Sequence, residues 1–291
     1  VLREFDRLHR TYHAWKPSEL SALNDALAAS RPKQVTPEMA TLLVDAQRLS
    51  RLSENLFDPG IGRLIALWGF QSDDLPTALP DERALAGWQA SRPGISDLIV
   101  EGQWVRSGKR GVAVDFGGYL KGVALDRAAA LLRSQGVHDA LINIGGNVMA
   151  LGTRQGEPWR VGIQHPRQAG ALATLELADG EAIGTSGDYQ RYLEVDGKRY
   201  CHLLDPRSAS PVTHTQALTV LIPAGEQAGT LSDVWSKPLF IAGDDWPRLA
   251  RRLGVTQALR IDASGRLQVT TALQRRLIYV GKEPAGSQII P

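Results

Sequence analysis

The spacing of apolar residues changes along the chain, and this change limits the folds available to it. Residues 1–29 place apolar side chains three or four positions apart, interrupted at Pro17-Ser18-Glu19, which predicts two consecutive helices. Thr36-Pro37-Glu38 predicts the start of a third helix, because threonine is a good cap and proline suits the first turn. Beyond residue 98, alternation predicts strands. Because helices and strands do not alternate strictly, we expect an α+β fold with mixed sheets and packed helices.

Glycines and turn dipeptides divide the rest of the chain. Leu98–Val105 and Gly111–Phe116 are predicted to pair as a hairpin, and Gly117-Gly118 then leads into a helix that Gly136 ends. Asp196-Gly197 is the best hairpin turn in the sequence. Further strands are expected near 140–144 (buried), 159–164, 171–177, 182–185, 189–195, 199–204, 218–222, 258–261 and 277–280, and further helices near 81–90, 226–242 and 246–253. The 291 residues predict one sizeable core, as a single domain over residues 1–291 or as two closely joined lobes.

Composition excludes several classes of function. The net charge of +2, from 33 basic and 31 acidic side chains, and the lack of a basic run with aromatics argue against nucleic-acid binding. No apolar stretch approaches the roughly 20 residues of a transmembrane helix, so we expect no membrane-spanning segment. The single cysteine, Cys201, excludes an internal disulfide framework and multi-thiolate zinc sites, and it fits either a reducing cytoplasm or an exported protein. The chain begins at Val1 in a charged helical pattern, so we expect that any targeting segment was removed or not included.

Two glycine-containing segments are candidate ligand sites. Gly117–Gly122 lies between a predicted strand and helix, where free backbone N–H groups and Lys121 could meet a diphosphate. The alternative is a tight turn that needs small residues. Ile183–Tyr189 brings two hydroxyls and two glycines to a strand, which suits a polar ligand or a capped turn.

Two further groups carry titratable side chains. A lone histidine is more often a structural hydrogen-bonding residue, but His202 is followed by Asp205-Pro206-Arg207, which makes it a better candidate for proton transfer. Asp233 and Lys237 share one face of a helix, either as a surface ion pair or, for Asp233, as a ligand of Mg²⁺ beside a diphosphate. Motifs of serine hydrolases and zinc enzymes are absent from the sequence.

Taken together, these segments resemble one family. The chain contains, in order, FDPGIGRLIALWGF, VDFGGYLKGVALDRAAALLRSQGV, INIGGNVMALG, GIQHPR, IGTSGDYQRYLEVDGKRYCHLLDPR and SDVWSKPLFIAG. They are similar to the flavin transferases of the ApbE type, and the similarity runs from KPSELSALN to ALRIDASGRL, nearly the whole chain. The resemblance implies an ApbE-like, T-fold-like architecture. It also implies transfer of FMN from FAD to a threonine or serine of an acceptor protein, with release of AMP.

The resemblance also implies roles for individual residues. The flavin pocket would include Phe57, Asp58 and an aromatic near Pro17, either Tyr12 or Trp15. Asp115 and Lys121 would contact FAD, and the Gly118 carbonyl would ligate Mg²⁺. The remaining roles belong to the last third of the chain: cofactor contact by Thr185 and Ser186, the catalytic base His202, loop orientation by Asp205, and metal binding by Asp233.

Three positions depart from the pattern of the family. Relatives usually read D-A-x-x-T where this chain reads Asp233-Val234-Trp235-Ser236-Lys237, so Lys237 replaces a threonine that helps to bind Mg²⁺. An ammonium cannot ligate a cation, so either Lys237 places a fixed positive charge against the diphosphate or Ser236 takes the role of ligand. We therefore expect weakened or absent Mg²⁺ binding. The other departures are Asn147 for aspartate, and Ser208 and Ala209 for threonine and glycine.

Three functions remain open at this point. The first is FMN transfer to an acceptor with an FMN-binding domain carrying a Ser/Thr-Gly-Ala-Thr type motif, as in a subgroup that serves the nitrous oxide reductase system. The second is a non-catalytic FAD carrier or assembly factor, and the third is an FAD pyrophosphatase in which water replaces the acceptor hydroxyl. The resemblance implies a periplasmic location or the outer face of the cytoplasmic membrane.

Overall fold

The structure is a computed structural model that describes residues 1–72, 74–284 and 286–291. The chain divides into two compact units. The first, here called the sheet unit, consists of Val1, Leu120–Gln190 and Thr213–Pro291. The second, here called the helical unit, consists of Leu2–Tyr119 and Arg191–Val212.

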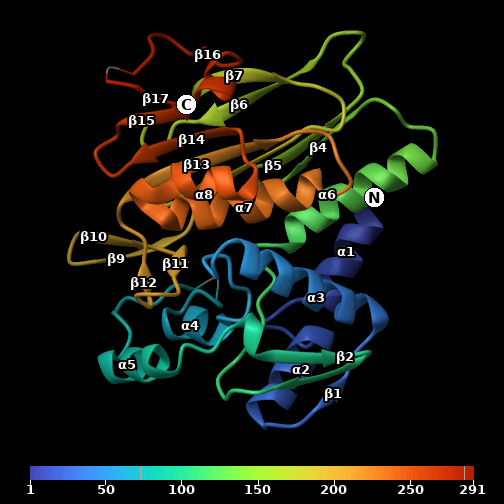
Figure 1. Cartoon of the computed structure of the whole chain (residues 1–291), viewed down its shortest axis with the longest axis vertical. Helices are drawn as coiled ribbons and strands as arrows, with labels where there is room; N and C mark the ends of the chain where they lie inside the picture. The colour runs from blue at the N-terminus through green and yellow to red at the C-terminus, as the bar shows by residue number, and fades with distance from the viewer. Residues whose placement is uncertain (73, 285) are drawn as a thin grey trace. The chain divides into compact units, whose positions relative to one another are not determined.

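A seven-stranded sheet forms the centre of the sheet unit (Figure 1). Its order is β17-β15-β14-β13-β8-β5-β4, and neighbours are antiparallel except for the parallel pair β15 and β17. The strands span Gln288–Ile290 (β17), Leu267–Thr270 (β15), Gln257–Asp262 (β14), Thr215–Ile222 (β13), Ala182–Gly187 (β8), Asn147–Leu151 (β5) and Ala140–Ile144 (β4). Every residue of the central strand β13 is buried, which indicates that both faces of the sheet are covered.

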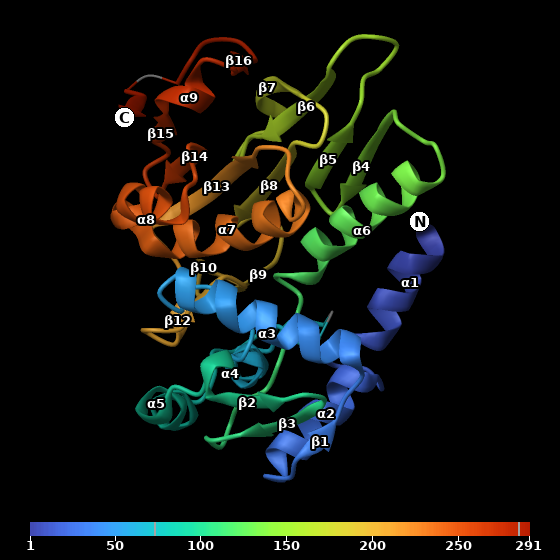
Figure 2. The same ribbon diagram turned by 45° about the vertical axis from the view of Figure 1, so that its right-hand side comes forward.

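Helices cover one face of this sheet and a smaller sheet covers the other. Helices α6 (Leu120–Ser134) and α7 (Ala228–Ala242) lie across the strands, and α8 (Trp246–Leu253) packs against α7 after the short turn η2, Gly243–Asp245 (Figure 2). The smaller sheet has the order β16-β7-β6, with β16 at Ile278–Tyr279, β7 at Ala171–Leu177 and β6 at Trp159–Gln164. Apolar residues of both sheets, such as Ile163, Leu175, Ile183 and Leu259, share one core cluster, and α9 (Thr271–Gln274) packs beside it.

Glycines allow α6 and α7 to approach closely. A Cβ atom added at Gly122 would lie 2.5 Å from the Gly229 carbonyl oxygen and 2.6 Å from the Thr230 Cα. Across the same contact, the Asp126 carboxylate of α6 accepts hydrogen bonds from the Gly229 N–H at 2.7 Å and the Thr230 N–H at 2.8 Å. A carboxylate at this place caps the first turn of α7, whose N–H groups have no partner within the helix. The two helices are therefore joined at the start of α7.

Replacing Gly122 by alanine is expected to destabilise the protein by about 1–3 kcal/mol, because the added methyl group would overlap the backbone of α7. The free energy of unfolding in urea measures this loss. Gly87, inside helix α5 of the other unit, is the matched control because no atom lies within 4 Å of an added Cβ. Gly87→Ala is expected to leave stability unchanged or to raise it by up to about 1 kcal/mol. Equal midpoints for Gly122→Ala and wild type would contradict the close contact.

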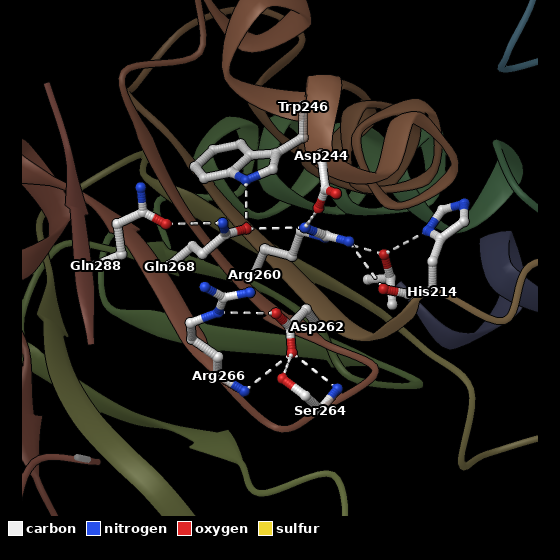
Figure 3. Close-up of polar contacts among 10 residues, drawn as sticks. His214, Asp244, Trp246, Arg260, Asp262, Ser264, Arg266, Gln268 and Gln288 are labelled. Carbon is white, nitrogen blue, oxygen red and sulfur yellow. Dashed lines mark hydrogen bonds and ion pairs between the residues drawn. The ribbon is translucent and has the colours of Figure 1, made fainter. Parts of the chain in front are cut away.

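A buried arginine forms hydrogen bonds with several segments of the sheet unit (Figure 3). Arg260 of β14 is 1% exposed. Its guanidinium donates to the Thr215 hydroxyl at 3.0 Å, to the side chains of Asp244 and Gln268 at 2.8 Å each, and to the His214 carbonyl at 2.8 Å. A buried charge requires such hydrogen bonds and ion pairs, because they replace the interactions with water that the charge loses on burial.

Among its described residues, the helical unit contains five helices and three small groups of strands. The helices are α1 (Leu2–Thr11), α2 (Glu19–Ala28), α3 (Pro37–Leu52), α4 (Gly62–Leu67) and α5 (Glu82–Ser91), with a 3₁₀ turn η1 at Ile95–Asp97. The strands are β1 (Lys33–Gln34), β3 (Trp104–Ser107) and β2 (Leu98–Glu101) in one sheet, β9 (Tyr192–Val195) with β10 (Lys198–Cys201), and β11 (Leu204–Asp205) with β12 (Ser210–Pro211). Ser18, Thr36 and Asp81 cap α2, α3 and α5 through their side chains.

The structure confirms the α+β prediction and corrects two local ones. The predicted hairpin of Leu98–Val105 with Gly111–Phe116 is wrong: β2 pairs with β3 across Gly102, which has a φ of +61°, and Ala113 bridges Ile61 instead. Ala140–Ile144 is an edge strand in which only Ile142 is buried, rather than a buried strand. Within the described residues, no helix is long and apolar enough to cross a membrane.

Candidate functional site

Several predicted site residues of the sheet unit meet at one place, which we call the lysine corner. It consists of Lys121 in the first turn of α6, Asp233, Ser236 and Lys237 on α7, and Ser186 on β8. Gly184 allows β8 to lie close to α7, because a Cβ there would be 2.3 Å from the Ser232 carbonyl oxygen. The corner therefore depends on small residues where helix and sheet meet.

Asp233 is 1% exposed, and both its carboxylate oxygens and its main-chain carbonyl oxygen accept hydrogen bonds. Oδ1 accepts from the Lys237 ammonium at 2.6 Å and Oδ2 accepts from the Gly122 N–H at 3.0 Å. The main-chain carbonyl of Asp233 accepts from the Lys237 ammonium at 2.7 Å and from the Ser236 hydroxyl at 2.8 Å. The spacing of four residues on a helix places Lys237 over Asp233, as the sequence predicts.

Charge keeps Asp233 ionised despite its burial. Burial alone would raise the pKa of Asp233, but the positive charges of Lys237 and Lys121 and a contribution from Asn147 hold it below its usual value. Burial, together with Lys121, lowers the pKa of Lys237, while the Asp233 carboxylate opposes this shift. Two lysines and one aspartate leave the corner with one net positive charge.

The hydroxyl side chains of β8 bind protein groups on two sides. The Ser186 and Ser236 hydroxyls are 2.8 Å apart, and the Thr185 and Thr219 hydroxyls are 2.9 Å apart. Because the Ser236 hydroxyl donates to the Asp233 carbonyl, Ser186 is the donor in the first pair. Ser186 and Ser236 are buried, whereas Thr185 is partly exposed. Contact of Thr185 and Ser186 with FAD stays a prediction.

The residues of this corner do not fit Mg²⁺. Mg²⁺ requires hard oxygen ligands in near-octahedral geometry. The carboxylate and carbonyl oxygens of Asp233 already accept from Lys237, Ser236 and Gly122, and a lysine cannot act as a ligand. Gly118, the third expected ligand residue, lies in the turn of residues 117–119 before α6. In residues 1–72, 74–284 and 286–291, no group of three or more His, Cys, Asp or Glu side chains could hold a metal ion.

In the helical unit, Asp115 joins Trp15 to the glycine turn. Its Oδ1 accepts from the Gly117 N–H at 2.7 Å and its Oδ2 accepts from the Trp15 indole N–H at 3.0 Å. Burial raises the pKa of Asp115, and the two hydrogen bonds oppose this shift. The Arg191 guanidinium lies 5.3 Å from the centre of the Trp15 ring, within range of a cation–π interaction. Trp15 is 39% exposed, so its ring can meet a ligand.

The other predicted flavin contacts are buried. Tyr12, Phe116, Tyr119 and Phe57 form a chain of aromatic contacts with ring centres 6.2, 5.5 and 6.3 Å apart. Tyr12 is 3% exposed and Phe57 is 4% exposed. Of the two alternatives near Pro17, the exposure therefore favours Trp15 over Tyr12 as the residue that touches flavin.

Asp58 orders a loop. Its Oδ1 accepts from the Gly60 N–H at 2.7 Å and from the Ile95 N–H at 2.8 Å. A Cβ at Gly94 would lie 2.2 Å from Oδ2, so glycine is needed beside this carboxylate. Burial raises the pKa of Asp58 to about 6, although both backbone hydrogen bonds act in the opposite direction.

This pKa predicts a pH dependence of stability. An unfolded aspartate titrates near 3.9, so the folded state binds more protons between that pH and about 6, and stability falls as the pH rises through this window. Between about pH 4 and pH 7, the free energy of unfolding of the wild type is expected to fall by roughly 2–3 kcal/mol relative to that of Asp58→Asn. Urea unfolding of both proteins at several pH values measures the difference. A difference that does not change with pH would contradict the raised pKa.

His202 is held in one tautomer. It lies between β10 and β11, and both its backbone N–H and its Nδ1 are bonded to the Arg191 carbonyl, at 3.1 and 3.0 Å. Because a carbonyl oxygen only accepts, Nδ1 carries the proton, and Nε2 is the basic nitrogen of the neutral ring. The ring of Phe70 contacts it edge-on at 6.4 Å. These bonds fix the orientation of the His202 ring, and its role as catalytic base stays a prediction.

Asp205 fixes the loop that follows His202. Its carboxylate accepts from the Arg207 backbone N–H at 2.8 Å and from the Arg207 guanidinium at 2.8 and 3.0 Å. The Asp205 carbonyl also accepts from the Ala209 N–H at 2.9 Å, which closes the turn between β11 and β12. These contacts order the turn locally, and a role of Asp205 in the cofactor site stays a prediction.

Comparison with known proteins shows the family of this chain. The model of the ApbE family matches residues 1–259. The chain belongs to the ApbE family. A relative from Rhodobacter capsulatus with the name FAD:protein FMN transferase is 40% identical over 288 residues, which cover 98% of this chain and 54% of that protein. A protein of the same name from Klebsiella pneumoniae (strain 342) is 32% identical over 270 residues, covering 90% of this chain and 74% of the relative. The chain thus spans about half the length of the first relative.

Solved structures of ApbE proteins share this fold. The ApbE protein from Thermotoga maritima superposes with a TM-score of 0.86 at 27% identity, covering 94% of this chain and 89% of its own. The flavinyl transferase ApbE from Pseudomonas stutzeri, in its apo form, gives a TM-score of 0.80 at 28% identity, covering 94% and 86%. The resemblance inferred from the sequence motifs is therefore confirmed.

The structure shows the local surroundings of two residues, Ala209 and Asn147, that depart from the ApbE pattern. The resemblance implies glycine at the position of Ala209, whose φ is +57°, a conformation that glycine adopts at less cost than alanine. Asn147 is 1% exposed on β5 and contributes to the low pKa of Asp233. An uncharged amide suits this place because the carboxylate of an aspartate would repel that of Asp233.

Sequence reasoning missed two residues of this ApbE chain that lie beside predicted site residues, one in each unit. Arg191 contacts Trp15 through its side chain and His202 through its carbonyl. Asp126 caps α7 and so positions Asp233. Both residues lie within segments that resemble the family, Asp126 in VDFGGYLKGVALDRAAALLRSQGV and Arg191 in IGTSGDYQRYLEVDGKRYCHLLDPR, but no local pattern singles them out.

The predicted residues thus form a group in each unit. The helical unit joins Trp15 with Asp115, while Tyr12 and Phe57 lie in its buried aromatic chain and Asp58, His202 and Asp205 order separate loops. The sheet unit joins Lys121, Ser186, Asp233, Ser236 and Lys237.

Proposed function

We propose that this chain is an FAD:protein FMN transferase, which binds FAD and attaches its FMN half to a threonine or serine of an acceptor protein. The observation that carries the proposal is the 40% identity, over 98% of the chain, to a protein of that name. The basic Nε2 of His202 and the positive lysine corner supply two groups that such a reaction needs.

In the proposed reaction, the acceptor hydroxyl oxygen attacks the phosphorus of the FMN phosphate. The hydroxyl proton passes to Nε2 of His202. The bond from that phosphorus to the bridging oxygen breaks, and AMP leaves with the bonding electrons. FMN then remains on the acceptor as a phosphodiester. Positive charge from Lys121 and Lys237 stabilises the diphosphate as negative charge builds up.

The partner and location are part of the proposal. The acceptor is an FMN-binding domain with a Ser/Thr-Gly-Ala-Thr type motif, and the departures at Asn147, Ala209 and Lys237 support a specialised subgroup such as one serving nitrous oxide reductase maturation. We place the reaction in the periplasm or at the outer face of the cytoplasmic membrane. Cys201, buried and without a disulfide, is compatible with that location. Fractionation of the natural host, with immunodetection of the protein, tests it.

One incubation tests the activity. The purified protein is mixed with FAD, with and without an acceptor domain that carries the motif, and the products are identified by mass spectrometry. An increase in acceptor mass that matches one FMN, lost when the acceptor threonine is replaced by alanine, is the expected result. AMP and free FMN without acceptor would indicate a pyrophosphatase instead, and intact FAD in every reaction would indicate a carrier.

A further inference from the structure

We propose that Lys237 is the resident cation of the diphosphate site, so that this chain binds FAD and transfers FMN without Mg²⁺. The proposal rests on the FMN transferase function proposed above. It concerns the side chain that neutralises Asp233, at the place where the family pattern implies a metal.

The first observation is that Asp233 is inaccessible to a metal ion. Its side chain is 1% exposed, whereas 17% of the Lys237 side chain is exposed. A ligand that reaches this part of α7 therefore meets the Lys237 side chain before the carboxylate. Displacing the ammonium would break its contacts of 2.6 and 2.7 Å with Asp233 and leave a second cation beside the incoming metal.

Ser236 does not supply a replacement ligand. Its hydroxyl donates to the Asp233 carbonyl at 2.8 Å and accepts from Ser186 at 2.8 Å. The side chain is 1% exposed, so it would have to rotate out of a buried pair to reach a metal. The alternative in which Ser236 takes over the role of the missing threonine is therefore disfavoured.

The second observation is that the Lys237 ammonium keeps one donor for a ligand. An ammonium has three N–H groups, and two of them donate to the carboxylate and carbonyl of Asp233. Across residues 1–72, 74–284 and 286–291, the third has no hydrogen-bond partner. A phosphate oxygen is its natural acceptor, since a charge-assisted hydrogen bond to phosphate is among the stronger ones. Asp233 thus fixes the ammonium in position for that bond.

The third observation is the balance of charge. Asp233 neutralises one of the two lysines, so the corner presents one net positive charge to a diphosphate. A divalent ion in place of the Lys237 ammonium would leave two net positive charges, because Lys121 of α6 is present in both cases. Lys237 therefore supplies one unit of positive charge less than a divalent ion would, but it cannot dissociate.

The decisive experiment uses the unaltered protein. It is freed of metal with EDTA and desalted, and Mn²⁺ binding is followed by electron paramagnetic resonance. FAD affinity and FMN transfer to the acceptor domain are then measured in EDTA and in excess Mg²⁺. We expect no stoichiometric Mn²⁺ site, and FAD affinities and transfer rates that differ by less than about twofold between the two conditions. Stoichiometric Mn²⁺ that is lost in Asp233→Ala, or transfer that stops in EDTA and returns with Mg²⁺, would overturn the proposal.

Variants at Lys237 test the same idea from the other side. Lys237→Thr restores a hydroxyl beside Asp233, so it is expected to bind Mn²⁺ and to become stimulated about tenfold or more by Mg²⁺. In EDTA, the same variant is expected to bind FAD about tenfold or more weakly than wild type. Lys282→Thr, at an exposed lysine, is the matched control and should behave as wild type. A Lys237→Thr variant that keeps wild-type FAD affinity in EDTA would contradict the assignment.

The two proposals can fail separately. Transfer that needs Mg²⁺ would leave the transferase function intact and overturn the role of Lys237. If no acceptor is modified under any condition, the transferase function fails, and FAD affinity in EDTA and in Mg²⁺ still decides the role of Lys237. Because the metal and FAD measurements on wild type need no variant, they decide the question even if a Lys237 variant does not fold.

Discussion

Replacing His202 by asparagine is expected to slow FMN transfer by about 10²–10⁴-fold, while FAD affinity changes by less than about threefold. The Arg191 carbonyl holds the proton of His202 on Nδ1, so Nε2 is the nitrogen that would receive the proton of the attacking hydroxyl in the proposed reaction. Asparagine can still donate to that carbonyl through its amide, but it has no basic nitrogen. The local backbone should therefore remain as it is, and the loss should fall on the chemical step.

The measurement is the single-turnover rate of acceptor modification, with FAD binding measured separately. His138→Asn is the matched control because His138 is exposed and lies outside the residues assigned to the site, and it should retain the wild-type rate. If His202→Asn modified the acceptor within about threefold of the wild-type rate, His202 would not be the base.

Replacing Lys237 by methionine is expected to destabilise the protein by about 3–5 kcal/mol. The variant leaves the Asp233 carboxylate buried without its closest cation, and Lys121 compensates only in part. A double variant, Asp233→Asn with Lys237→Met, removes both charges and should recover most of this loss, because replacing a buried ion pair by neutral groups is often nearly neutral. Urea unfolding of wild type, both single variants and the double variant gives the coupling between the two sites.

The pH dependence gives an independent test of the same pair. The folded pKa of Asp233 lies below its unfolded value, so the stability it contributes is present above about pH 4 and is lost as the pH falls through the folded pKa. The difference between wild type and Lys237→Met should therefore shrink in acid. A constant difference from neutral pH into acid, or no rescue in the double variant, would show that packing rather than charge stabilises this corner.

Local signals in the sequence predicted most of the secondary structure. Thr36 before Pro37, the Pro17-Ser18-Glu19 segment and Asp196-Gly197 each determine a cap or a turn with neighbours in sequence, and each prediction is confirmed. The predicted hairpin of 98–105 with 111–116 was wrong because Gly102 already turns the chain. Choosing between two nearby turn signals depends on packing, which a single sequence does not contain.

The site was predictable only where its contacts are local. The pairing of Lys237 with Asp233 follows from helical spacing, and it is present. The link from Trp15 to Asp115 joins residues 100 positions apart, and no local pattern predicts it. No local pattern predicts that the Gly122 N–H of another helix binds Asp233. Nor does one predict that Tyr12 is buried while Trp15 is partly exposed. Residue types were recognisable from the sequence, but their roles depend on tertiary contacts.

The joint between α6 and α7 has a consequence for dynamics. Asp126 binds the first turn of α7, and the glycine contact leaves no space for the helices to slide. Lys121 and Lys237 should therefore move as parts of one rigid body, with little change in spacing when FAD binds. Amide hydrogens at this joint should be among the slowest to exchange in the sheet unit, with or without ligand. Two positive charges that are held rigidly before the substrate binds require no reorganisation during the proposed transfer of FMN.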